Sequence, residues 1–153
     1  FSSEKYQSDE PEEGVVASPD THALDPDVHL HNKNGNIIHV HKTGVTLGQF
    51  FSSLGMTLTN NCLKTDDGKN YCDDASRSLK MFVNGTRSDK YDQYVPKDLD
   101  RVLISYGSLT DKAIPNQITA VTEDACIYSE KCPERGSAPK EECVGGLGTD
   151  CTQ

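Results

Sequence analysis

Residues 28–41, VHLHNKNGNIIHVH, place two His-x-His pairs on either side of an Asn/Gly-rich turn. Such a turn between short apolar-polar runs predicts a β-hairpin. Successive side chains of a strand point to opposite faces, so the two histidines of each pair share a face, about 7 Å apart at Cα. The stretch therefore indicates a hairpin that presents imidazoles in pairs.

The register of this hairpin decides whether the two pairs meet, because a one-residue slip moves every side chain of a strand to the other face. A three-residue loop over residues 34–36 would bring the pairs face to face. It sets His31 opposite His39 and His29 opposite His41. A two-residue type I′ turn at residues 34–35 would instead set His31 opposite Ile38, and the pairs would diverge. Both registers are open from the sequence.

Converging imidazoles would form a candidate metal site. Neutral nitrogen donors suit copper or zinc better than calcium or magnesium, which prefer oxygen. His22, Asp25 and Asp27 lie just upstream and could complete the ligand shell or orient a ligand. We expect copper or zinc as the cofactor, bound by His29, His31, His39 and His41. The alternative is a set of solvent-facing polar residues on an edge hairpin, or a pH-sensitive cluster.

The size and charge of the chain limit its class and partners. Its 153 residues, of which 34% are hydrophobic, suffice for one domain with a modest core. No apolar run approaches the roughly 18 residues of a membrane span, and no signal peptide with a basic leading segment is found at Phe1, so we expect a mature or trimmed soluble part without membrane insertion. Residues 1–27 carry seven of the nine net negative charges. We expect a flexible acidic arm there, and no nucleic-acid partner.

Six cysteines without any C-x-x-C predict disulfides and an oxidising compartment, either extracellular or at the cell surface. They are Cys62, Cys72, Cys126, Cys132, Cys143 and Cys151. Chain order favours Cys62 with Cys72 and leaves the other four to pair among themselves. The sequon that begins at Asn84 makes this residue a glycosylation candidate and is consistent with export.

The clearest predicted helix spans residues 46–55, TLGQFFSSLG. Thr46 and Gln49 can form a capping box, apolar residues recur at i, i+3, i+4 and i+7, and Gly55 can end the helix in the left-handed conformation. The apolar stripe should pack on a sheet. We expect the polar segment 60–78 to be a solvated loop closed by a disulfide.

Two later segments, residues 79–85 and 101–107, predict strands by their β-branched and aromatic content. The order hairpin, helix, strand, crossover, strand indicates an α+β fold with a β-grasp-like ββαββ core, in which one helix packs on a mixed four-stranded sheet. This domain would span residues 28–107. Residues 108–153 would add a short helix, beginning near Pro115, and a Cys-rich tail.

These residues together resemble a family. The H-x-H hairpin, the G with I-I-H, the TLGQFF helix, the strand ending V-N-G and the run D-x-D-R-V-L-I-S-Y-G are similar to small exported or membrane-anchored domains of uncultivated bacteria and archaea. The resemblance covers about residues 27–107 and implies a β-grasp-like domain outside the cytoplasm with no established activity. Family members often have glutamate in place of His41, which implies either a weaker case for a metal site at this position or a His/carboxylate ligand set. Their occasional label of protein-disulfide isomerase finds no support here, because C-x-x-C is missing.

The sequence supports three hypotheses of function. The first is an extracytoplasmic metal-binding domain for capture, storage or structural locking. The second is a structural cell-surface or filament subunit that joins other copies of itself through its N-terminal arm or a sheet edge. The third is a zinc hydrolase with Asp25 or Asp27 as general base. We identify no catalytic residues with a diagnostic motif, and we expect a binding protein rather than an enzyme.

Overall fold

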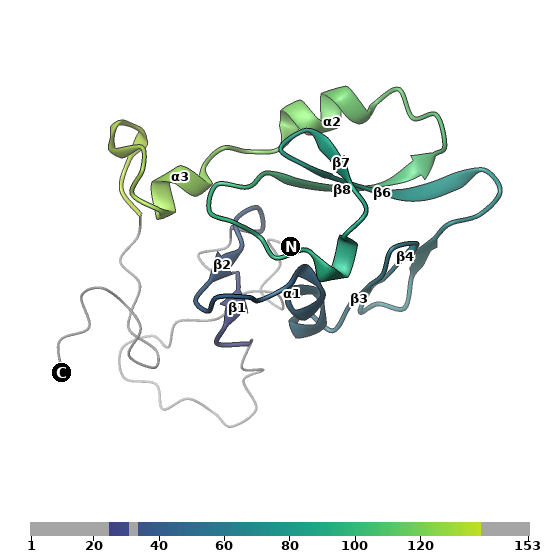
Figure 1. Cartoon of the computed structure of the whole chain (residues 1–153), viewed down its shortest axis with the longest axis horizontal. Helices are drawn as coiled ribbons and strands as arrows, with labels where there is room; N and C mark the ends of the chain where they lie inside the picture. The colour runs from purple at the N-terminus through teal and green to yellow at the C-terminus, as the bar shows by residue number, and fades with distance from the viewer. Residues whose placement is uncertain (1–24, 31–33, 139–153) are drawn as a thin grey trace.

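The structure is a computed structural model that describes residues 25–30 and 34–138, and it has an α+β fold (Figure 1). Its elements follow in chain order: β1 (Val28–His29), β2 (His39–Val40), α1 (Leu47–Ser53), β3 (Thr57–Leu58), β4 (Cys62–Lys64), β5 (Asn70–Cys72), β6 (Arg77–Val83), β7 (Thr86–Ser88), η2 (Tyr91–Gln93), β8 (Val102–Ser108), α2 (Ile114–Ala120), α3 (Ala125–Tyr128) and η3 (Pro133–Arg135). Several predictions lie outside the described residues. They concern the acidic arm up to residue 24, with His22, and also His31, Cys143 and Cys151.

Helix α1 forms as the sequence predicts. The backbone amide of Gln49 donates to Thr46 Oγ1 at 3.2 Å, and the backbone amide of Thr46 donates to Gln49 Oε1 at 2.9 Å. These two bonds complete the capping box. Gly55 follows the helix with φ +71°, in the left-handed region. The buried face of α1 packs into one core with residues from the hairpin and from β6. This core includes Leu30, Leu47, Phe50, Phe51, Leu79 and Met81.

The strands form three small antiparallel sheets, ordered β1–β2, β3–β4–β5 and β7–β6–β8. The expected mixed four-stranded β-grasp-like sheet is therefore not confirmed. Asn84-Gly85 makes the tight turn that the sequence indicates, and the chain returns along β6 as β7. Strand β6 then has β7 on one edge and β8 on the other, so it has no free edge for the histidine hairpin. The hairpin forms a sheet of its own.

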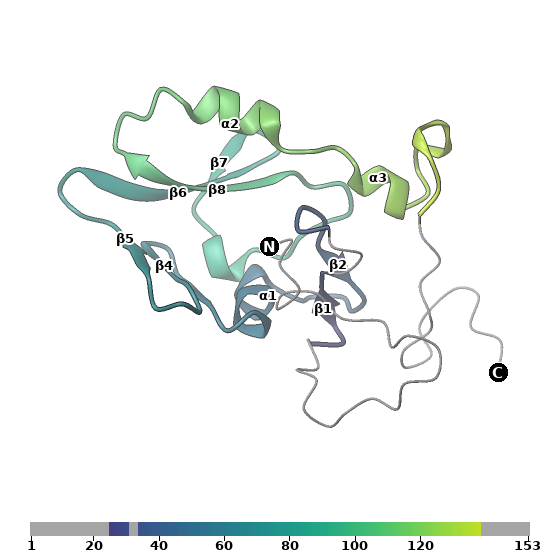
Figure 2. The ribbon, with the colours of Figure 1, turned by 180° about the vertical axis from the view of Figure 1, so that it is seen from behind.

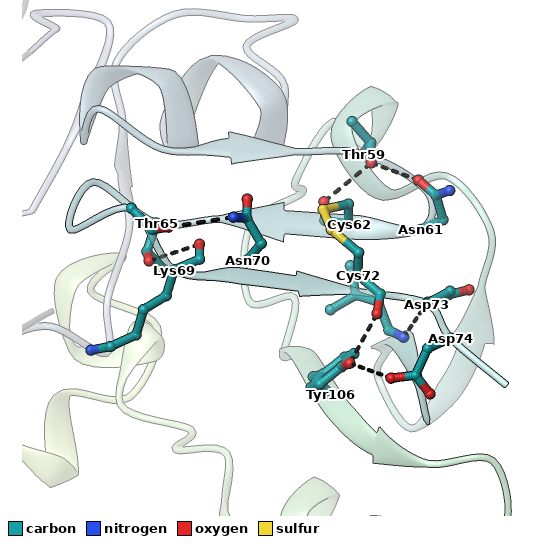
Figure 3. Close-up of a disulfide and its surroundings, with 12 residues drawn as sticks. Thr59, Asn61, Cys62, Thr65, Lys69, Asn70, Cys72, Asp73, Asp74 and Tyr106 are labelled. Atoms are coloured by element: carbon teal, nitrogen blue, oxygen red, sulfur yellow. Dashed lines mark hydrogen bonds between the residues drawn. A yellow bond between two sulfur atoms is a disulfide. The ribbon is translucent and has the colours of Figure 1, made fainter. Parts of the chain in front are cut away.

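The segment 60–78, expected as a loop, contains the hairpin β4–β5 (Figure 3). Its disulfide joins Cys62 to Cys72, which lie directly opposite each other in the ladder, and the predicted pairing is confirmed. The hydroxyl of Tyr106, on β8, donates to the Cys72 carbonyl at 2.9 Å and so connects this hairpin to the neighbouring sheet (Figure 3).

The connection from η2 to β8 is fixed by side chains. The side-chain amide of Asn84 donates to Asp100 Oδ1 at 2.7 Å, and the backbone amide of Arg101 donates to Asn84 Oδ1 at 2.9 Å. The Tyr94 hydroxyl donates to Asp100 Oδ2 at 2.6 Å, and burial together with this bond raises the pKa of Tyr94 to about 12. The loop presents Leu99 in the left-handed region, with φ +66° and 41% exposure.

The C-terminal part begins with α2, which has Pro115 in its first turn as predicted and lies alongside the β7–β6–β8 sheet (Figures 1 and 2). It continues to α3, which is closed by a disulfide between Cys126 and Cys132. This bridge confirms a pairing within the last four cysteines. None of the helices in residues 25–30 and 34–138 has the length and apolarity to cross a membrane.

Candidate metal centre

The register of the β1–β2 hairpin pairs His29 with His39 and Val28 with Val40. Both registers considered from the sequence are therefore wrong: the observed one is shifted by two residues from the convergent register and by one from the divergent register. A shift of two preserves the faces of a strand. His29, His39 and His41 thus share one face of the hairpin, as the convergent register required.

The three imidazoles form a row with His29 in the middle. The ring centroids of His29 and His41 lie 4.7 Å apart with planes 25° from parallel, and their Nε2 atoms are 3.3 Å apart. The His29 and His39 centroids lie 6.3 Å apart with planes 5° from parallel. His39 is 8% exposed, whereas His41 is on the surface. We call His29, His39 and His41 the histidine row.

The segment just before β1 orients this row. His29 Nδ1 lies 3.4 Å from the Asp25 carbonyl oxygen. A carbonyl oxygen can only accept, so this contact favours a proton on Nδ1 of neutral His29 and leaves Nε2 as the nitrogen that can bind a metal ion. A backbone carbonyl is one of the usual outer contacts of a metal-binding histidine. The contact is therefore compatible with metal binding through Nε2.

The two upstream carboxylates have other contacts. Asp25 Oδ1 accepts the Asp27 amide at 2.8 Å, and Asp27 Oδ2 pairs with Lys42 Nζ at 2.7 Å. The hydrogen bond that Lys42 donates to the Asp27 carboxylate raises the pKa of Lys42. The Asp27 carbonyl also accepts the His41 amide at 2.9 Å. Both aspartates thus support the hairpin, and this gives no sign of the general base that a zinc hydrolase needs.

The distance within the His29–His41 pair can be compared with metal geometry. Two nitrogens about 2.05 Å from a tetrahedral ion lie about 3.3 Å apart, and at a square-planar angle they lie about 2.9 Å apart. The observed 3.3 Å fits the tetrahedral case. Because lone pairs lie in the ring planes, stacked planes do not direct both onto one ion, so one ring must rotate. His41 is exposed and has room to do so.

The described residues supply a pair of nitrogens rather than a complete ligand set. Within residues 25–30 and 34–138, no group of three or more His, Cys, Asp or Glu side chains gathers closely enough to hold a metal ion. His31, the remaining predicted ligand, lies outside these ranges. The four-histidine set stays a prediction, as does glycosylation of Asn84, whose amide nitrogen donates to Asp100.

A contact from far along the chain was missed by sequence reasoning. The ring of Tyr128, on α3, meets the His39 ring edge-on at 4.9 Å and 88°. The Tyr128 hydroxyl accepts a hydrogen bond from Asn34 Nδ2 at 3.1 Å. A tyrosine between two cysteines carries no signal of a partner 94 residues away. The contact belongs to the tertiary fold alone.

A groove of about 750 Å³ runs beside the row, between β2, the loop before β8 and α3. Its lining includes Val40, Val95 and Leu99, which are each about two-fifths exposed. These are three of the four exposed large hydrophobic residues in the part of the chain that the structure describes. The groove is therefore the most apolar exposed feature beside the histidine row.

No family model, curated protein or solved structure matches this chain. The resemblance to small exported domains stays a prediction, and the functional argument depends on the histidine geometry.

Proposed function

We propose that this chain is an extracytoplasmic metal-binding domain whose histidine row holds zinc or copper, for capture, storage or structural locking. The observation that supports this most strongly is the 3.3 Å separation between the Nε2 atoms of His29 and His41. Imidazole nitrogens are common ligands of both metals. Both metals are retained, because one ring must rotate before the two nitrogens can bind one ion and the spacing can change with it.

The location outside the cytoplasm is supported by the two disulfides, Cys62–Cys72 and Cys126–Cys132. Disulfides persist in oxidising compartments and are rare in the cytosol of most organisms. We propose an extracellular or cell-surface location on this basis. The β-grasp-like ββαββ arrangement is retained only as a proposal.

The test is metal content. Protein purified without an affinity tag or chelator should contain zinc or copper by elemental mass spectrometry, or take up one equivalent of added zinc(II). A His29→Ala, His41→Ala double variant should lose this metal, and Lys42→Ala, an exposed neighbour, should keep it. Wild-type protein that neither contains metal nor takes it up near neutral pH would overturn the proposal.

A second candidate is a surface subunit that assembles with copies of itself, and the groove favours it. A contiguous exposed apolar surface often marks a protein interface. Leu99→Asn would remove the apolar side chain while keeping a residue type that tolerates the left-handed conformation. Sedimentation should show concentration-dependent assembly of the wild type that is weakened in this variant. A wild-type monomer at all concentrations would exclude this candidate.

A further inference from the structure

Tyr128 contacts the histidine hairpin at two points. Its ring lies edge-on against His39 in β2, and its hydroxyl accepts from the Asn34 amide in the segment before β2. Perpendicular packing of two rings limits the rotation of each, because rotation would break the contact or produce a clash. A residue of the C-terminal part therefore contributes to the orientation of His39 in the row.

Tyr128 in turn is held by a closed loop. Helix α3 has four residues, far too few to be stable on its own. The Cys126–Cys132 disulfide joins α3 to the residues that follow it and so closes a loop that contains Tyr128. Arg135 spans the same loop, donating to the Glu123 carbonyl at 3.2 Å and pairing with Asp124 at 2.7 Å.

The loop is also fastened to the body of the domain. Ser129 donates to Asp98 Oδ1 at 2.5 Å, and Lys131 forms an ion pair with the same carboxylate. The bonds from Lys131 and Ser129 hold the pKa of Asp98 below its usual range. Asp98 belongs to the rigid loop before β8, so α3 is fixed against the domain next to the hairpin (Figures 1 and 2).

We propose that Tyr128 is a positioning residue of the histidine row, and that the Cys126–Cys132 loop is the part of the chain that places it. This contact keeps the His39 ring parallel to His29. The consequence for metal affinity rests on the proposed metal-binding function, with His39 as a third ligand beside His29 and His41, because a ring held in place loses less conformational freedom on binding. Loss of an outer contact that orients a ligating histidine typically weakens a metal site about 10- to 100-fold, and we expect the lower end of this range for a ring contact.

The first test uses three variants of matched design. Tyr128→Ala removes the edge contact, Tyr128→Phe keeps the ring and removes only the hydroxyl, and Tyr71→Ala removes a ring from the edge-on pair with Tyr106, away from the hairpin. Zinc(II) titration against a competing chelating dye should show about tenfold or greater weakening for Tyr128→Ala. Tyr128→Phe and Tyr71→Ala should stay within about threefold of the wild type, since both leave the edge contact in place.

A metal-free readout separates positioning from metal binding. Nuclear Overhauser contacts between the Tyr128 and His39 rings should be seen in the wild type, and the His39 ring resonances should move in Tyr128→Ala but hardly in Tyr128→Phe. Unchanged His39 resonances in Tyr128→Ala would overturn the inference. A wild type that binds no zinc, but shows these His39 changes, would overturn the proposed function and leave the positioning role established.

The second test addresses the loop. A Cys126→Ser, Cys132→Ser double variant should reproduce the His39 changes of Tyr128→Ala, and a Cys62→Ser, Cys72→Ser variant should not. Asp98→Ala removes the carboxylate that Ser129 and Lys131 contact and leaves the bridge intact, so it tests the loop even if the cysteine variant fails to fold. It should also move the His39 resonances, and unchanged resonances would count against the loop. Wild-type His39 resonances in a folded Cys126→Ser, Cys132→Ser variant would overturn the role of the loop.

Discussion

The Nε2 atoms of His29 and His41 lie 3.3 Å apart, although the ladder pairs His29 with His39 and not with His41. The side chains therefore meet along the diagonal of the hairpin rather than straight across it. A diagonal pair of long or aromatic side chains can reach across adjacent strands. The distance between these two nitrogens depends on side-chain rotation as well as on register.

The tautomer of His29 is the first testable consequence. Because the Asp25 carbonyl can only accept, we expect the proton of neutral His29 on Nδ1 and a lone pair on Nε2. Long-range ¹H–¹⁵N spectra above pH 7 should show this pattern. It should persist in His41→Ala, since the carbonyl and not the partner imidazole fixes it. A proton on His29 Nε2 in that variant would contradict the assignment.

Gly48 provides a test of packing against helix propensity. Glycine to alanine inside a helix normally stabilises by roughly 0.5–1 kcal/mol. At Gly48, however, an added Cβ would lie 2.9 Å from the Asp92 carbonyl oxygen in η2, and backbone cannot easily move away. We expect Gly48→Ala to destabilise by about 1–3 kcal/mol in urea unfolding. Ser52→Ala, at an exposed position of the same helix, is the control and should change stability little.

The Tyr94–Asp100 hydrogen bond predicts loss of stability in alkali. The pKa of Tyr94 is raised to about 12 in the folded chain, against about 10 for an unperturbed tyrosine. A raised folded pKa contributes stability that is complete below the unfolded value and is lost as the pH rises through the folded value. The free energy of unfolding should therefore fall between about pH 10 and 12, and less so in Tyr94→Phe. Equal slopes for both proteins would contradict this.

The two disulfides should differ in their effect on the core. Cys62→Ser, Cys72→Ser opens a bridge with a sequence separation of 10 and should cost about 2–3 kcal/mol in urea unfolding. Cys126→Ser, Cys132→Ser should leave the core transition nearly unchanged, because α3 contributes no buried residue. Under graded reduction, hydrogen exchange should rise in α3 before it rises in α1. Simultaneous exposure of both would show that the C-terminal loop does not open separately.

Local signals in the sequence were enough to predict part of the fold. Thr46, Gln49 and Gly55 specify both ends of α1 by short-range hydrogen bonds and a permissive backbone, so tertiary structure was not needed to place it. Strands β6 and β8 were predicted because both are rich in β-branched, aromatic and other apolar residues. The Cys62–Cys72 bridge followed from proximity in the chain.

The remaining features depend on contacts that no local pattern encodes. Strands β4, β5 and β7 have three residues each, which is too few to show a usable hydrophobic period. The separate sheets result from β7 taking the second edge of β6. For the site, the shared face of His39 and His41 followed from their spacing, while the register that brings His29 to that face and the Tyr128 contact required the folded chain.

The β1–β2 ladder pairs His29 with His39 and so places His29, His39 and His41 on one face of the hairpin. This pairing constrains how the hairpin can change over evolution or in engineering. A shift of the register by two residues would slide one strand past the other yet keep His39 and His41 facing the same way. A shift by one residue would turn both away from His29. Changes that move the register should therefore fall into two groups, in which even shifts keep the three imidazoles on one face and odd shifts separate them.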